Sequence, residues 1–176
     1  SNGKLVATDI SDESIEIAKK RIPKSSKIEF FVTDMQDFTH SEKFDFVVLP
    51  DVLEHIPIDQ HDTLFKNIVN LMHEKSIVLI HIPHPKALDY SRQFTPEIMQ
   101  IVDQSISAKQ MMDTTYKNDL VLIDYKSYSV FNNVHDYVLP TFRKDYGVTL
   151  KSQPKSVIIK RKLFARLRFY FDKMVG

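Results

Sequence analysis

Three aspartates stand directly after predicted strands, and their carboxylates are the first candidates for binding chemistry. Asp9, Asp34 and Asp51 each follow a short run rich in apolar or β-branched residues. In open sheets with helical crossovers, ligands bind beyond the carboxyl ends of the strands. A carboxylate offers two acceptor oxygens, which suits a pair of ribose hydroxyls, and Asp9 is the candidate for that role. For Asp9 taken alone, an equally weighted interpretation is that it only caps the next helix.

Alternating strand and helix patterns predict the elements that must position these carboxylates. A helix is expected between Ser11, a favoured cap residue, and Pro23. Asn132 and Asn133 indicate a turn, so the last two strands are expected to pair antiparallel. Segment 86–118 is expected to be mostly helical and irregular, and residues 64–72 have helical spacing. Strands are expected at 4–8, 28–33, 44–49, 76–82, 120–131 and 137–142, which together predict an α/β sheet.

Composition bounds the class of protein. A chain of 176 residues with 43% hydrophobic and 27% charged residues can build one ordinary globular core. The chain has no cysteine, which excludes disulfides, cysteine zinc sites and thiol catalysis and is typical of a reducing compartment. No signal peptide opens the chain and no apolar run is long enough to span a bilayer. We therefore expect a cytoplasmic location.

Charge is divided unevenly between two segments, which we expect to be a domain at 1–150 and a C-terminal extension at 151–176. The first carries 16 Lys and Arg against 22 Asp and Glu, and the second carries 8 against 1. A helix is predicted at 162–174, with basic residues beside an apolar stripe. Three interpretations remain open, in falling order of weight: packing on the domain or a second subunit, peripheral contact of 160–174 with an anionic membrane surface, and contact with nucleic acid. The stripe contains Leu163, Leu167, Tyr170, Phe171 and Met174.

The strand-end aspartates belong to three segments that follow one another in a recognisable order. These are VATDISDESIEIAKKR at 6–21, FVTDMQDF at 31–38 and FDFVVLPDVLEHI at 44–56. Together they resemble the class I S-adenosylmethionine-dependent methyltransferases of the small-molecule type. The resemblance covers residues 3–84 and continues more loosely to about residue 144. It implies a Rossmann-like, doubly wound α/β fold with a mostly parallel sheet and an antiparallel late strand.

The resemblance also implies a cofactor, S-adenosylmethionine, with S-adenosylhomocysteine as product, and assigns roles to particular residues. Asp9 is expected to bind the ribose hydroxyls, and Ile10 to pack on the adenine. Asp34 is expected to receive the adenine amino group, and Met35 to give a backbone contact. The residues expected to border the methionine part are Pro50 and Asp51.

One part of the family pattern does not occur in this sequence. The first strand, the Gly-rich loop after it and the first helix are expected before Lys4, and nothing in the chain matches them. In this fold the first strand lies between the strands that end at Asp9 and Pro50. Without it, two strand edges stay unpaired, and the chain alone is expected to bind the cofactor weakly.

Two of the seven histidines are candidates for chemistry. His55 follows the third strand and is a candidate general base, with structural hydrogen bonding of the loop as the more heavily weighted alternative. Its neighbour Glu54 has a similar structural alternative, as a carboxylate at a helix N-terminus. His84 is a candidate for lining the acceptor pocket. His81 and His84 lie three residues apart in an extended segment, which places them poorly for chelation, so no metal site is expected. Four others are expected at the surface: His40, His61, His73 and His135.

The sequence therefore favours methyl transfer to a small-molecule acceptor or to a glycan-type or lipid-linked one, and it leaves two alternatives open. A nicotinamide-dependent oxidoreductase of the Rossmann type is disfavoured, because no tyrosine has a lysine four residues later. A non-catalytic methyltransferase-like binding module is favoured if the upstream loop is truly absent. The acceptor is expected to contact segments 83–118 and 125–140, which contain no recognisable motif. The oligomeric state has no signal in the sequence.

Overall fold

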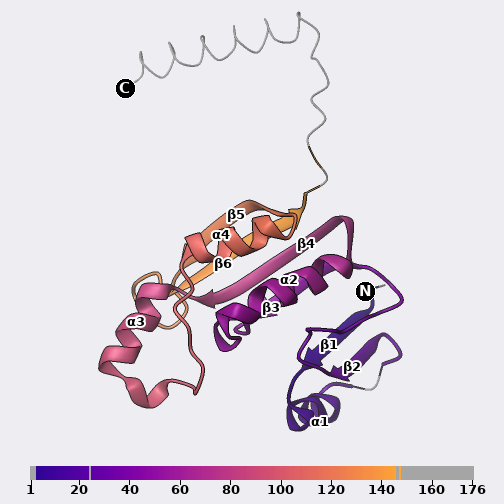
Figure 1. The fold of residues 1–176 in the computed structure, drawn as a ribbon. Coiled ribbons are helices and arrows are strands. Elements are labelled where there is room, and N and C mark those ends of the chain that lie inside the picture. Colours follow the sequence, from indigo (N-terminus) through magenta and orange to yellow (C-terminus); the bar gives the residue numbers. More distant parts are fainter. Residues whose placement is uncertain (1–2, 24, 146, 148–176) are drawn as a thin grey trace, which may run out of the picture. The chain divides into compact units, whose positions relative to one another are not determined.

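The computed structural model describes residues 3–23, 25–145 and 147, and the fold of these residues is drawn in Figure 1. By contacts the chain divides into two units, Ser1–Tyr146 and Gly147–Gly176. The predicted tail helix at 162–174 lies outside the described residues. The division at residue 150 stays a prediction.

The first two strands form a small parallel unit with one crossover helix. Strand β1 (Leu5–Asp9) pairs with β2 (Ile28–Val32), and helix α1 (Asp12–Arg21) connects them. Ser11 caps α1, because its Oγ accepts a hydrogen bond from the Ser14 N–H at 3.2 Å. Acidic residues in the first turn and basic residues in the last turn stabilise α1, because their charges interact favourably with the helix dipole. The predicted strand–helix–strand unit is confirmed.

The other four strands form a mixed sheet in the order β3-β4-β6-β5. Their bounds are Phe44–Pro50 for β3, Met72–Pro83 for β4, Leu120–Tyr128 for β5 and Tyr137–Lys144 for β6. Strands β3 and β4 are parallel, and β6 is antiparallel to both of its neighbours. The predicted α/β class and the antiparallel late pair are confirmed. Among the described residues no ladder joins β1 to β3, the position where the family resemblance places the first strand.

The core lies between one face of this sheet and two helices. Helix α2 (His61–Asn70) contacts β4, and α4 (Ala108–Lys117) contacts β5 and α2 (Figure 1). Val78, Ile80 and Ile82 point to this face at alternate positions of β4, and all three are at least 99% buried. They pack with Phe65 and Phe142, which are fully buried. Met72, which the helical spacing placed in a helix, instead begins β4, since α2 ends at Asn70.

Short segments connect the sheet to the remaining helix. Two 3-10 turns, η1 (Leu53–His55) and η2 (Ile58–Gln60), lie between β3 and α2. Helix α3 (Pro85–Phe94) follows β4, and η3 (Pro96–Ile98) follows α3. An irregular segment, residues 99–107, then leads to α4. The sheet therefore presents the carboxyl ends of β3 and β4 to η1 and to this segment.

Candidate functional site

Asp51 stands at the carboxyl end of β3 in a backbone conformation that is rare for a residue with a side chain. Its φ is 49°, in the left-handed region. The Asp51 N–H donates to the His81 carbonyl at 2.8 Å, which fixes the turn against β4. The same two residues meet through their side chains, with 3.4 Å between Asp51 Oδ2 and His81 Nδ1. Backbone strain of this kind is concentrated at functional sites.

Four rings, those of His81, Tyr128, Phe131 and Tyr137, form an aromatic wall at this pair. The His81 ring stacks on Tyr137 at a centroid distance of 4.6 Å and lies 6.0 Å from Tyr128. Phe131 meets the edge of Tyr137 at 5.7 Å. Tyr137 opens β6 and is the register partner of Pro83, so β6 brings it to the carboxyl end of β4. Burial, and then the Asp51 carboxylate, raise the pKa of Tyr137 to about 12, so its hydroxyl keeps its proton at neutral pH.

Glu54 is the most buried carboxyl group beside this wall. The residue is 2% exposed, and its Oε2 meets no hydrogen-bond donor among the described residues. Its Oε1 lies 4.0 Å from His55 Nε2. Burial above all raises the pKa of Glu54 to about 7, and the negative charges of Asp51 and Asp103 act in the same direction. At neutral pH this carboxyl group can therefore either carry or accept a proton.

His55 is oriented by two acceptors on one of its ring nitrogens. Nδ1 lies 2.8 Å from the Asp103 Oδ1 and 2.8 Å from the Val102 carbonyl. Because a carbonyl and a carboxylate only accept, Nδ1 is assigned the proton in the neutral ring, and Nε2 the lone pair. The imidazole thus presents its basic nitrogen on the side of Glu54. Sequence reasoning named His55 but missed Asp103, which lies in an irregular segment without periodicity.

The segment that supplies Asp103 is attached to the loop after β3. Gln104 donates its backbone N–H to the Glu54 carbonyl at 2.9 Å, and its side-chain Nε2 donates to the Ile56 carbonyl at 2.5 Å. Arg92 of α3 donates to the Asp103 carbonyl at 2.8 Å. These bonds hold the 99–107 segment against η1, so that the position of His55 depends on a segment almost fifty residues away in sequence.

The raised pKa of Glu54 predicts an unusual dependence of stability on pH. A carboxyl group that binds its proton more tightly when folded stabilises the protein at low pH, and that contribution is lost as pH rises from about 4.5 to about 7. We expect the free energy of unfolding to fall by about 2–3 kcal/mol over this range, and Glu54→Gln to remove the decrease. Urea unfolding at pH 5 and pH 8 measures both. A wild-type decrease that persists in Glu54→Gln would assign it to another group.

Asp9 lies at the carboxyl end of β1 and has two possible roles, capping and ligand binding. Its Oδ1 accepts the Ser11 N–H at 2.8 Å, as the capping interpretation requires. Its Oδ2 accepts no hydrogen bond from the described residues, so one oxygen is already used and the other faces outward. Ile10 beside it is 75% exposed, an apolar side chain available for packing.

The loop after β2 begins at the same end of the small sheet, since the Thr33 N–H donates to the Asp9 carbonyl at 2.9 Å. The exposed Asp34 accepts the Gln36 N–H through Oδ1 at 3.0 Å. Met35 has a φ of 66°, and its N–H donates to Thr33 Oγ1 at 3.0 Å. A backbone contact from this N–H to a ligand therefore requires that the Thr33 hydroxyl be displaced.

Two contacts attach this loop to helix α2. The Asn67 side-chain amide donates to the Met35 carbonyl at 2.8 Å, and Gln36 donates to Gln60 at 2.9 Å. Gln60 ends η2 and directly precedes α2, whereas Asn67 lies in the last part of this helix, so the loop after β2 runs along α2. The contact of Gln36 with Gln60 joins this loop to the segment that follows β3.

The remaining predicted residues have mainly structural contacts. Pro50 is the last residue of β3 and the register partner of His81. His84 caps α3, because its Nδ1 accepts the Lys86 N–H at 3.2 Å, and its own N–H donates to the Asp136 carbonyl at 2.7 Å. The expectation that His61 lies at the surface is wrong. It is 3% exposed, since its Nε2 meets the carbonyls of Leu53 and Ile56 under η1.

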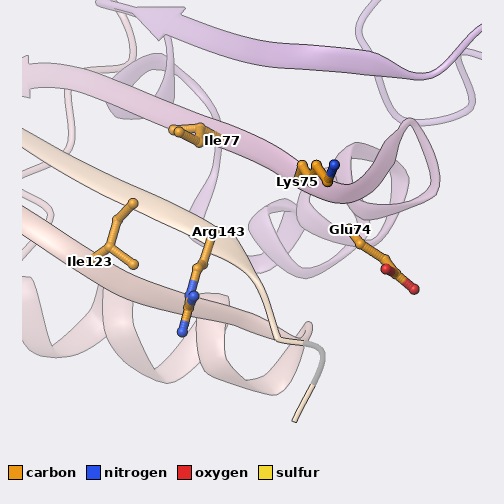
Figure 2. A pocket seen from close by; sticks show the side chains of 5 residues that line it. All are labelled: Glu74, Lys75, Ile77, Ile123 and Arg143. Carbon is orange, nitrogen blue, oxygen red and sulfur yellow. The ribbon is translucent and has the colours of Figure 1, made fainter. Parts of the chain in front are cut away.

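A separate hollow lies at the other end of β4. Figure 2 shows its lining, with Ile77 on β4 and side chains from β5 and β6 around it. The lining residues are Glu74, Lys75, Ile77, Ile123 and Arg143. Glu74 and Lys75 stand near the amino end of β4, whereas His81 stands near its carboxyl end, so the hollow is not part of the strand-end site. Within the described part of the chain, no cluster of three or more His, Asp or Glu is arranged to hold a metal ion, and no helix is long and apolar enough to cross a membrane.

Comparisons with known proteins give a family match for part of the chain and a shared fold for most of it. Residues 1–75 match the family model described as a methyltransferase domain. The fold matches the N-methyltransferase NodS from Bradyrhizobium japonicum with a TM-score of 0.62 and 19% identity, covering 81% of this chain and 74% of NodS. It also matches an S-adenosylmethionine-dependent methyltransferase from Clostridium acetobutylicum with a TM-score of 0.66 and 12% identity, covering 81% of this chain and 75% of that one. No curated protein matches the sequence.

A third match shows the same fold in a longer protein. LepI, solved in complex with S-adenosylmethionine, matches with a TM-score of 0.64 and 17% identity over 82% of this chain and 37% of LepI. The match to the family model includes the segments that end at Asp9, Asp34 and Asp51, and the solved structures share the mixed sheet. Residues 1–75 thus resemble a methyltransferase domain, and the fold of the chain is that of solved S-adenosylmethionine-dependent methyltransferases.

Proposed function

We propose that this chain transfers the methyl group of S-adenosylmethionine to a small-molecule acceptor, or to a glycan-type or lipid-linked one, held beyond the carboxyl ends of β3 and β4. The observation that supports this proposal is the grouping of Asp51, Glu54, His55 and Tyr137 at those strand ends. Carboxylate, imidazole and phenol groups together can bind a polar acceptor, orient it and take its proton. The sulfonium of the bound cofactor supplies an already activated methyl group.

In this proposal residues at the carboxyl ends of β1, β2 and β3 would hold the cofactor. The free Oδ2 of Asp9 accepts from the ribose hydroxyls, and the exposed Ile10 packs on the adenine. Asp34 receives the adenine amino group, with Met35 beside it. The methionine part borders Pro50 and Asp51, where negative charge favours a sulfonium cation.

The protein's own contribution to the reaction is positioning and proton transfer. Bringing an acceptor atom in line with an activated methyl group accounts for a large share of the rate by proximity alone. His55 Nε2 then takes the proton that the acceptor loses, and Asp103 holds the imidazole in that tautomer through Nδ1. His84 lines the acceptor pocket from the start of α3.

Asp9→Ala tests the cofactor part of the proposal. We expect it to weaken S-adenosylhomocysteine binding by about 2–4 kcal/mol, because charge-assisted hydrogen bonds to two hydroxyls are lost. Isothermal calorimetry on the full chain measures the change. Ser11→Ala is the matched control, since it removes the cap at the Ser14 N–H without touching the proposed ribose site. Equal affinity in wild type and Asp9→Ala would contradict the assignment.

A further inference from the structure

The buried carboxyl group of Glu54 has an oxygen for which the protein supplies no donor. Oε2 is inaccessible to solvent and accepts no hydrogen bond from the described residues. Most buried polar side-chain atoms have a partner, and a buried carboxylate without one costs several kcal/mol unless a ligand or a proton compensates it. The Glu54 backbone N–H acts on the carboxyl group but leaves Oε2 without a donor, and Gln104 contacts the Glu54 carbonyl rather than its carboxylate.

The charges around Glu54 favour a cation. Asp51 and Asp103 both add negative charge beside it. Among the described residues, the ion pairs of these carboxylates are with histidines: Glu54 with His55 at 4.0 Å, Asp103 with His55 at 2.8 Å and Asp51 with His81 at 3.4 Å. An acceptor with a carboxylate or phosphate would add a further negative charge to this cluster. A positively charged acceptor would neutralise it.

The aromatic wall provides a second feature of the same kind, independent of the carboxylates. Tyr137 is stacked between the His81 ring and the edge of Phe131, and Tyr128 completes the wall. Phe131 is 79% exposed, so the wall reaches solvent. Aromatic faces attract cations through their negative π surface, most strongly where water is excluded. The wall and the carboxylates meet at Asp51, whose charge acts on the Tyr137 hydroxyl.

We propose that the methyl acceptor is an amine, bound as its ammonium form between Asp51, the buried Glu54 and the aromatic wall. This inference rests on the proposed function, because it names the acceptor class for that same site. The more exposed Asp51 accepts one ammonium N–H, and the Glu54 carboxylate, whose Oε2 has no donor among the described residues, accepts a second once its side chain turns toward the acceptor. The rest of the acceptor lies against Tyr137 and Phe131.

Proton and electron transfers balance without a further reactant. Glu54 takes one proton from the ammonium group, which leaves a neutral amine with a free lone pair. That lone pair forms the N–C bond to the methyl group, the S–C bond breaks, and its electron pair stays on sulfur. The positive charge of the sulfonium is thereby transferred to the methylated nitrogen. The proton on Glu54 leaves through His55, whose Nε2 is 4.0 Å from Oε1. A carboxyl group with a pKa near neutrality suits this exchange.

The test compares two probes of the same shape, 2-phenylethylamine and 2-phenylethanol, on the full chain saturated with S-adenosylhomocysteine. Calorimetry is expected to show at least tenfold tighter binding of the amine, because a charge-assisted hydrogen bond to a buried carboxylate is about that strong. With S-adenosylmethionine instead, mass spectrometry is expected to detect the N-methylated amine and no methylated alcohol.

Substitutions test whether Glu54 causes the preference for the amine over the alcohol. Glu54→Gln keeps the side-chain shape and is expected to reduce the preference for the amine to below threefold. Asp51→Asn is the second variant, in case Glu54→Gln does not fold, and is expected to reduce it less. Glu74→Gln, at the other end of β4, is the control and is expected to leave it unchanged.

The outcomes separate the two proposals. Binding of S-adenosylhomocysteine with no preference for the amine, or with no binding of either probe, overturns the amine assignment and leaves the proposed function intact. A preference that survives in both Glu54→Gln and Asp51→Asn also overturns it. Because weak binding is expected of this chain, S-adenosylhomocysteine is used at high concentration, and no binding by the wild-type chain under that condition contradicts the proposed function itself.

Discussion

His55→Ala is expected to lower kcat about 10²–10⁴-fold, the range that general acid–base groups contribute. In the proposed mechanism His55 Nε2 takes the acceptor proton directly or receives it from Glu54, so its loss stops the route by which that proton leaves. Cofactor affinity is expected to change little, since the proposed ribose site at Asp9 is on β1. Steady-state kinetics beside calorimetry with S-adenosylhomocysteine separate the two effects.

Asp103→Asn distinguishes a catalytic His55 from a structural one. The Asp103 carboxylate accepts from Nδ1 and so holds Nε2 as the basic nitrogen. We expect a smaller loss of kcat than in His55→Ala, with the free energy of unfolding and the affinity for S-adenosylhomocysteine little changed. A purely structural role would instead lower the free energy of unfolding. An unchanged kcat in His55→Ala would remove His55 from the mechanism.

Phe65→Ala is expected to lower the free energy of unfolding by about 3–5 kcal/mol, the usual cost of truncating a buried phenylalanine. Phe65 is fully buried where α2 packs on the sheet, among Leu64, Ile68 and Ile80. Because α2 also supplies Asn67 to the loop after β2, we expect weaker cofactor binding as a secondary effect. Urea denaturation measures the main change.

Phe46→Ala provides the matched control on the same sheet. Its side chain is 63% exposed on β3, so truncation is expected to cost less than about 1 kcal/mol. Equal losses in Phe65→Ala and Phe46→Ala would contradict the description of a core confined to one face of the sheet.

Much of the fold could be predicted because its signals are local. Alternation along β4, the cap at Ser11 and the turn at Asn132 and Asn133 each depend on neighbouring residues. Met72 was misassigned because an apolar residue at helical spacing fits a strand start equally well, and tertiary packing decides between them. Local sequence places His61 at the surface, because nothing in it shows that the ring contacts the carbonyls of Leu53, in η1, and of Ile56, directly after η1.

The site could be predicted only where a strand end located it. The strand-end rule predicts roles for Asp9, Asp34 and Asp51, and these roles stay predictions, whereas Asp103 and Tyr137 reach the candidate site from distant segments. The sequence gives only a weak indication that Tyr137 belongs to the site, namely that it begins the strand after the turn. The orphaned oxygen of Glu54 had none, because burial and hydrogen-bond partners are properties of the assembled fold.

A crystal structure of the full chain with S-adenosylhomocysteine tests the proposed cofactor site without any variant, because it locates the ligand itself. We expect the ribose hydroxyls within hydrogen-bond distance of Asp9 Oδ2 and the sulfur beside Pro50 and Asp51, on the side of His81 and Tyr137. Density for the ligand in the hollow around Ile77 and Arg143, or at any place away from the strand ends, would contradict it.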